Sequence, residues 1–169
     1  KINCGWGNSH TAQRYIANKL NKYFADVGKN LADKIAPSPF PFSHYMGEQL
    51  NTVFSFTPIA STDVISVIKG LKNKNCNIDC IPNRLYKLID KVIAPHLASL
   101  FNQSLNEGIY PESLKIAKIT PIYKAGDPSI ASNYRPISIL PTTGKIFEKI
   151  VFDQLSNYLR INNILSQTQ

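Results

Sequence analysis

Cysteine, histidine and long apolar runs are scarce in this sequence, and each shortage excludes a class of protein. Its 169 residues include three cysteines, an odd number that argues against a disulfide framework and favours a reducing compartment. Cys76 and Cys80 have a spacing that suits two zinc ligands, but no second Cys or His pair follows them. We therefore interpret both as ordinary thiols. No apolar run is long enough to span a bilayer, so we expect no membrane partner.

Complete catalytic constellations are also missing. The sequence contains no Gly-rich phosphate loop, no His-Glu metal helix and no evident Ser/His/Asp set among its three histidines. Its eleven acidic residues are scattered and include no Asp-Asp pair, whereas a two-metal polymerase or nuclease needs carboxylates that converge on two cations. We therefore predict no catalytic residue and no metal ligand in this chain.

Positive charge is abundant and unevenly placed. The net charge is +8, and the excess falls in residues 69–91, with six Lys/Arg against two acids, and in residues 115–160, with seven against three. Two basic blocks favour a polyanionic partner, although a merely solvated basic surface would give the same charge. Within them we predict nucleic-acid contacts from four residues, Lys74, Lys115, Lys118 and Lys145.

Hydrophobic periodicity predicts an α+β fold that is mostly helical, with one irregular β-hairpin. The predicted helices cover residues 11–35, 61–73, 82–108 and 142–165, and the predicted strands cover 114–124 and 134–140. Pro121 and Pro136 cannot donate ladder hydrogen bonds, so both strands should be edge strands or irregular ones.

Several boundaries follow from single residues. Ser61 or Thr62, and later Thr142 or Thr143, are suited to cap helices, while Gly108 can end one. Pro82 suits a first helical position, and Pro95 should break or kink its helix near Ala94. On the last helix we expect a buried face, formed by Ile146, Ile150, Leu155, Tyr158 and Leu159.

The Pro-rich stretch at residues 36–45 reads as a linker or extended arm. It holds three aromatic residues, Phe40, Phe42 and Tyr45. We expect these side chains to dock on the domain rather than contact a ligand.

The predicted hairpin is the best candidate for function. One strand ends in Lys124 and the other begins with Tyr134-Arg135-Pro136, which brings two cations to the mouth of the connecting loop. Lysine supplies a point charge and arginine a planar fork, a combination that suits a triphosphate or a nucleic-acid backbone. The alternative is a surface arginine that pairs with Asp127 or Glu148.

The segment from residue 110 to 169 resembles the start of the reverse transcriptase domain of non-LTR, LINE-type retrotransposons, closest to the jockey-like group. The likeness rests on "PESLKIAKITPIYKAGD", then "NYRPISIL", then "KIFEKI", at fixed spacing. It extends upstream through "VISVIKGLKNKNCNIDCIPNRLYKLI" and covers residues 58–169. Residues 1–57 would be a helical extension and Pro-rich linker that precede the polymerase domain.

The resemblance implies the fingers subdomain of a right-hand polymerase, with Lys124 and Arg135 at the positions that contact the triphosphate of the incoming nucleotide. It implies as partners an RNA template, a DNA primer, deoxynucleoside triphosphates and the palm and thumb of the same polyprotein. Mg²⁺ would serve the full-length enzyme and would not be bound by this chain. An intracellular location, nucleus or cytoplasm, is expected from the family.

Two departures from the family pattern affect function. Asn77 and Cys80 flank Asp79 where the family usually has glycines, and the family's palm aspartates match no position here. We therefore expect a fragment of an RNA-directed DNA polymerase that is not catalytic alone. The alternatives are a domesticated basic nucleic-acid-binding or interaction module, and a pseudogene product without function.

Overall fold

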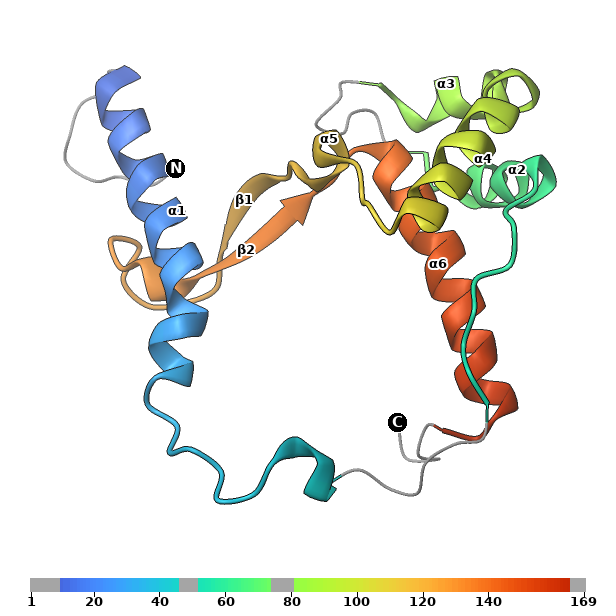
Figure 1. The fold of residues 1–169 in the computed structure, drawn as a ribbon. Coiled ribbons are helices and arrows are strands. Elements are labelled where there is room, and N and C mark those ends of the chain that lie inside the picture. The colour runs from blue at the N-terminus through green and yellow to red at the C-terminus, as the bar shows by residue number, and fades with distance from the viewer. Residues whose placement is uncertain (1–9, 46–51, 74–80, 165–169) are drawn as a thin grey trace. The chain divides into compact units, whose positions relative to one another are not determined.

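The structure of this chain, a computed structural model, describes residues 10–45, 52–73 and 81–164, with side chains from residue 13 onward. Within these ranges the chain is mostly helical, with one two-stranded antiparallel sheet, as the sequence predicts (Figure 1). Residues 51–118 and 139–169 form one compact unit, the helical unit, and residues 1–50 and 119–138 form another, the hairpin unit. The boundary at residues 57 and 58 between an extension and a polymerase domain stays a prediction.

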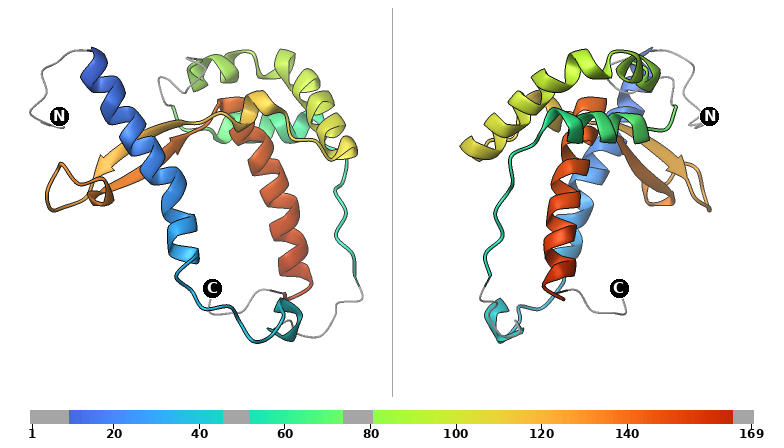
Figure 2. Two further views of the ribbon diagram at one scale, coloured as in Figure 1. Left: turned by 60° about the vertical axis from the view of Figure 1, so that its left-hand side comes forward. Right: turned by 90° about the vertical axis from the view of Figure 1, so that its right-hand side faces the viewer.

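The core of the helical unit lies where three helices meet. The described helices of this unit are α2 (Ser61–Gly70), α3 (Asn83–Leu88), α4 (Asp90–Glu107), α5 (Glu112–Lys115) and α6 (Thr142–Ile161). Figures 1 and 2 show α2 and α4 packed at the N-terminal half of α6. Phe101 of α4 and Phe147 of α6 stack face to face, with ring centroids 4.6 Å apart, and Ile68 of α2 is fully buried beside them.

Of the predicted break or kink at Pro95, the break is wrong, and the kink stays a prediction. Helix α4 runs through this proline, and the interruption falls earlier, at Ile89 between α3 and α4. Pro95 removes the hydrogen bond to the carbonyl of Lys91, but both residues are exposed, so water can satisfy that oxygen. Gly108 ends the helix as predicted, in the left-handed conformation with φ 66°.

Helix α6 begins without a hydroxyl cap. Its N-cap is Pro141, because the hydroxyls of Thr142 and Thr143 bind α3 instead: Thr142 donates to Asn83 Oδ1 at 3.1 Å, and Thr143 lies 3.0 Å from the Tyr86 hydroxyl. The predicted caps are therefore wrong, and the two threonines tie α6 to α3.

The other helix ends of this unit also differ in detail from the prediction. Helix α2 has Ala60, not Ser61 or Thr62, as its N-cap, and the Ala60 N–H donates to the Asp63 carboxylate at 2.8 Å. Pro82 is the N-cap of α3 rather than its first helical residue.

The buried face predicted for α6 holds over its first half only. Ile146 and Ile150 are buried, Tyr158 and Leu159 are half-buried, and Leu155 is 40% exposed. The predicted burial of Leu155 is therefore wrong. The helices that cover α6 reach only its N-terminal half, which leaves the second half of the predicted stripe more open.

An extended segment, residues 52–60, is fastened to the helices by side-chain amides. Gln154 of α6 accepts from the Thr57 N–H at 2.9 Å and donates to the Thr57 carbonyl at 3.1 Å. Asn102 of α4 binds Ile59 in the same reciprocal way, at 2.8 Å for each bond. The two amides thus satisfy backbone groups that a neighbouring strand would satisfy in a sheet.

In the hairpin unit, α1 (His10–Ala32) confirms the predicted first helix, and it passes through Gly28 without a break. The arm that follows contains a short 3₁₀ helix, η1 (Phe42–Tyr45). Phe40, Phe42 and Tyr45 are exposed within the hairpin unit, and their docking on the polymerase domain, which lies mostly in the other unit, stays a prediction. Phe40 stacks on His44, with ring centroids 4.3 Å apart.

The hairpin itself consists of β1 (Lys118–Tyr123), η2 (Ala131–Asn133) and β2 (Tyr134–Ile139), and α1 contacts η2. The predicted first strand began too early, because Leu114 is buried as part of the short helix α5 and the chain becomes extended only after it.

The register of the hairpin explains how it tolerates two prolines. The Lys124 N–H donates to the Asn133 carbonyl at 2.8 Å, so these two residues face each other. Counting along both strands from this pair places Pro121 opposite Pro136, at a pair that exchanges no hydrogen bonds. Each strand of a two-stranded sheet is an edge, as predicted, and neither proline costs a ladder bond.

Candidate nucleotide and nucleic-acid interface

The same register sets the relative position of the two predicted phosphate-binding cations. With Lys124 opposite Asn133, Arg135 is the diagonal cross-strand neighbour of Lys124 on the same face of the hairpin. Such neighbours are about 7–8 Å apart at their backbones, within reach of two long side chains that meet at one anion. The structure therefore gives Lys124 and Arg135 the juxtaposition that the sequence predicted.

Tyr123 and Tyr134 occupy the other face. They form the next cross-strand pair, and their rings lie 5.6 Å apart in a tilted arrangement. Because successive residues of a strand point to opposite sides, this aromatic pair is separated from the two cations by the sheet itself. One face of the hairpin is thus cationic at the loop end, and the other is aromatic.

The loop between the strands is tightly hydrogen-bonded. The Asp127 carboxylate accepts from the Ser129 N–H at 2.8 Å, and the Asn133 side-chain amide donates to the Asp127 carbonyl at 2.9 Å. The Tyr134 hydroxyl donates to the Pro128 carbonyl at 2.8 Å, and the Tyr123 hydroxyl donates to the Gly126 carbonyl. These hydrogen bonds give the loop between Lys124 and Arg135 a defined conformation.

The alternative in which Arg135 pairs with Asp127 finds no support, and a pairing with Glu148, which belongs to the other compact unit, stays a prediction. Among the described residues, neither ion pair of the chain involves Arg135 or Lys124. The Asp127 carboxylate accepts a hydrogen bond from the backbone N–H of Ser129 and, with a smaller effect, one from the Ser129 side chain. These hydrogen bonds lower the pKa of Asp127. Glu148 lies within 3.5 Å of the Tyr110 hydroxyl. Both carboxylates thus have other partners.

The four lysines that we predict to contact nucleic acid differ in their surroundings. Lys118 is exposed at the start of β1, and Lys145 lies half-buried in the first turn of α6. Lys115 forms an ion pair with Glu112 within α5, which offsets its charge locally. Lys74 lies outside the described residues. Of the four predicted contacts, Lys118 is the one that the structure presents as an exposed cation outside an ion pair in the described part of the chain.

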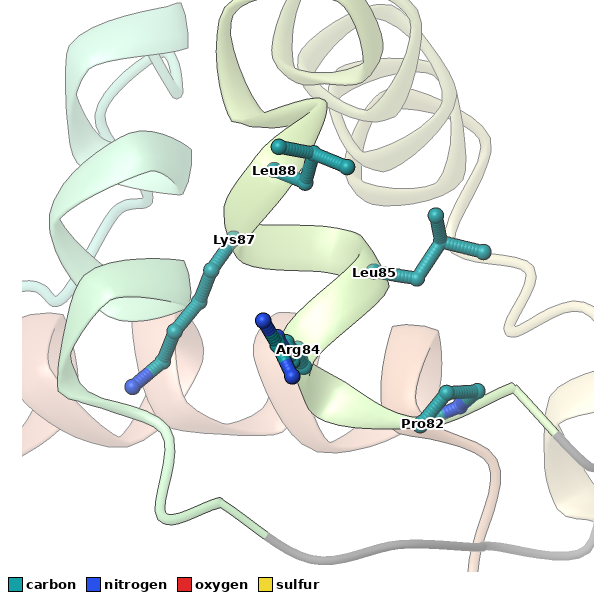
Figure 3. Close-up of a pocket in the computed structure, with 5 residues that line it drawn as sticks. All are labelled: Pro82, Arg84, Leu85, Lys87 and Leu88. Carbon is teal, nitrogen blue, oxygen red and sulfur yellow. The ribbon is translucent and has the colours of Figure 1, made fainter.

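A further cationic feature lies on α3. Pro82, Arg84, Leu85, Lys87 and Leu88 line a shallow hollow of about 570 Å³ (Figure 3). Figure 3 shows Arg84 and Lys87 extending from the same stretch of the helix, with Leu85 and Leu88 projecting from it as well. Sequence reasoning placed both cations in the first basic block but did not single them out. The signal was a basic pair at i and i+3, which puts both on one helix face.

The described residues do not form a metal site. Among the described residues, no three His, Cys, Asp or Glu side chains gather closely enough to hold an ion. Cys76 and Cys80, together with Asn77 and Asp79, lie outside the described residues. No helix in the described ranges is both long enough and apolar enough to cross a membrane.

Comparison with known proteins gives the family. The chain is 30% identical over 135 residues to the RNA-directed DNA polymerase from mobile element jockey of Drosophila melanogaster, an alignment that covers 75% of this chain and 15% of that protein. It is 30% identical over 114 residues to the probable RNA-directed DNA polymerase from transposon BS of the same species, covering 66% and 13%.

This chain belongs to the jockey-like reverse transcriptases of non-LTR retrotransposons. A third relative, the putative 115 kDa protein in the type-1 retrotransposable element R1DM, is 29% identical over 100 residues, or 57% of this chain and 10% of that protein. No family model matches the chain. The chain spans about 15% of the first curated relative, so it corresponds to part of a jockey-like polymerase.

Proposed function

We propose that this chain is the fingers region of the reverse transcriptase and that Lys124 and Arg135 bind the triphosphate of the incoming deoxynucleotide. The supporting observation is the hairpin register, which puts the two cations diagonally on one face beside the loop. A planar guanidinium and a compact ammonium at that spacing can share the oxygens of one polyphosphate.

Polymerisation would need more than this chain supplies. We propose that the palm and thumb of the same polyprotein provide the carboxylates and the Mg²⁺ site, and that cations such as Lys118 on β1 and Arg84 and Lys87 on α3 contact the RNA template and DNA primer. Because polyanion binding by Lys and Arg releases counterions, binding of an RNA–DNA duplex should weaken steeply with salt. Primer extension by this chain with Mg²⁺ should be absent, and measured extension would contradict the proposal.

The direct test is calorimetric titration of the 169-residue chain with deoxyadenosine triphosphate at low salt. The Lys124→Ala and Arg135→Gln variants should each weaken binding by about tenfold to a hundredfold, because a hydrogen bond to a charged group contributes about 1.5–3 kcal/mol. Arg160→Gln is the matched control, since Arg160 is an exposed arginine on α6 that bonds only to Asn157, at 2.9 Å, among the described residues. Equal affinity in all variants would exclude the site.

The alternative of a domesticated basic binding module makes a different prediction. Arg135→Ala would leave its nucleic-acid affinity unchanged, since binding by a diffuse basic surface does not depend on one guanidinium group. No described feature of the structure favours this alternative over the fingers assignment.

A further inference from the structure

Two residues that join the hairpin loop to β2 reach back into the loop. Tyr134 is only 9% exposed, and its hydroxyl donates to the Pro128 carbonyl at 2.8 Å. Asn133 donates from its side chain to the Asp127 carbonyl at 2.9 Å and accepts at its own carbonyl from the Lys124 N–H at 2.8 Å. Each residue thus holds one part of the loop against the start of β2.

We propose that Asn133 and Tyr134 are positioning residues of the triphosphate site, which hold the backbones of Lys124 and Arg135 at the spacing that grips a polyphosphate. The inference rests on the proposed function of those two cations. It adds that the loop is preorganised by its own side chains and that neither positioning residue contacts the phosphate.

A hydrogen bond restrains the backbone at Lys124, and the two neighbouring residues restrain it at Arg135. The Asn133 carbonyl holds the Lys124 N–H directly, so any shift of Asn133 moves Lys124. On the other strand, Arg135 lies between Tyr134 and Pro136. The Tyr134 side chain is held by its hydrogen bond to the Pro128 carbonyl. The ring of Pro136 fixes the φ angle of Pro136 and restricts the backbone of Arg135 before it. The side chains of Lys124 and Arg135 are both exposed.

Neither positioning side chain is placed to bind the ligand itself. Tyr134 projects from the face opposite to Arg135, as its ring pairing with Tyr123 at 5.6 Å shows. The side-chain amide of Asn133 is committed to the Asp127 carbonyl. Gly126 leaves room for it, because a Cβ at residue 126 would lie 2.6 Å from Asn133 Nδ2.

The preorganised hairpin loop should raise the affinity of the chain for a polyphosphate. A flexible loop must be ordered when the ligand binds, and that cost is subtracted from the binding free energy, whereas a loop already ordered avoids it. Removing one loop hydrogen bond should therefore weaken binding about threefold to tenfold, the size expected for one hydrogen bond, although the contact with the ligand is unchanged.

The experiment measures two quantities on the 169-residue chain: affinity for inorganic tripolyphosphate by calorimetry, and amide hydrogen exchange of Lys124 by NMR. Tyr134→Phe and Asn133→Ala should weaken binding threefold to tenfold and speed exchange of the Lys124 amide by a similar factor. Tyr158→Phe is the matched control, because its hydroxyl donates to a backbone carbonyl, that of Thr52, at the same 2.8 Å in the other compact unit. It should change neither quantity.

The outcomes separate the inference from the proposed function. If Tyr134→Phe and Asn133→Ala speed Lys124 exchange but leave the affinity unchanged, these residues only stabilise the loop and the inference is overturned. Unchanged exchange and affinity would overturn it as well. If the unmodified chain does not bind tripolyphosphate, or binds it equally after Lys124→Ala and Arg135→Gln, the proposed function itself fails and the positioning role falls with it.

Discussion

The side-chain amide of Asn102 pairs with both backbone polar groups of Ile59, accepting from its N–H and donating to its carbonyl at 2.8 Å each. Asn102 lies on α4, 43 residues away along the chain. Ile59 is buried, so water cannot easily replace the two bonds, and they hold the end of the extended segment at the start of α2. The Asn102–Ile59 pair therefore fixes the point at which the extended segment, residues 52–60, enters the core of the helical unit.

Asn102→Ala should lower the free energy of unfolding of the helical unit by about 2–3 kcal/mol. The substitution removes two hydrogen bonds and leaves a buried donor and acceptor unpaired, which costs more than the loss of an exposed bond. Urea unfolding followed by circular dichroism measures it. Gln103→Ala is the control, because its bond to Glu107 is exposed, and it should change stability by less than about 0.5 kcal/mol. Equal effects of both substitutions would contradict the role of the pair.

The Phe101–Phe147 stack should dominate the stability of the core. Phe101 is fully buried, with its ring plane 2° from that of Phe147, so Phe101→Ala leaves a cavity and should cost about 3–5 kcal/mol. Phe152→Ala, on the same helix as Phe147 but 60% exposed, should cost less than about 1 kcal/mol. Thermal and urea unfolding of the two variants check this, and a small effect at Phe101 would refute the placement of the core.

Hydrophobic period predicted the helices well because the pattern is repeated over many turns. The prediction was wrong where a single residue was expected to determine where a helix begins or ends. Pro95 did not break α4, since the carbonyl that it frees faces water, and that depends on which side of the helix the core lies. Thr142 and Thr143 did not cap α6, since their hydroxyls bind Asn83 and Tyr86 of another helix. Neither tertiary fact can be read from local sequence.

The candidate site divides in the same way. The nearness of Lys124 and Arg135 at the loop end of the hairpin could be predicted, because turn residues between two short strands bring their ends together, while their role in phosphate binding stays a prediction. The loop network could not, since Tyr134 and Asn133 bond to backbone carbonyls, which leave no trace in the sequence. The hollow on α3 was missed for a similar reason: a basic pair carries no signal of the apolar surface beside it.

Tyr110 should ionise at higher pH than an ordinary tyrosine. Burial raises the pKa of its hydroxyl above the usual 10.0, and the negative charge of Glu148 and its hydrogen bond raise it further. The neutral form is favoured in the folded state, so its stabilising contribution is complete below pH 10 and is lost as the pH rises through the folded pKa. Absorbance titration of the phenolates should contain a late-ionising component that comes from Tyr110.

Glu148→Gln separates the causes of this shift. It removes the negative charge, so the pKa of Tyr110 should fall, yet stay above the usual value because burial is the larger cause. Tyr110→Phe should remove one tyrosine from the late-ionising part of the titration curve, which assigns the shift to Tyr110. A late part that is unchanged by Tyr110→Phe would refute the assignment.

Gly126→Ala should loosen the hairpin loop, for two reasons that act together. Gly126 has φ 93°, a conformation strained for any residue with a side chain, and its Cβ would lie 2.6 Å from Asn133 Nδ2. Strain of about 1–3 kcal/mol should appear as faster hydrogen exchange at the Lys124 amide. Gly28→Ala is the matched control: it lies in α1 with nothing near its added methyl group, so it should raise helicity and stabilise α1 by about 0.5–1 kcal/mol. Because both variants add one methyl group, opposite signs can come only from the local backbone and packing. Loss of stability at both positions, or at neither, would contradict the loop structure on which the proposed triphosphate site depends.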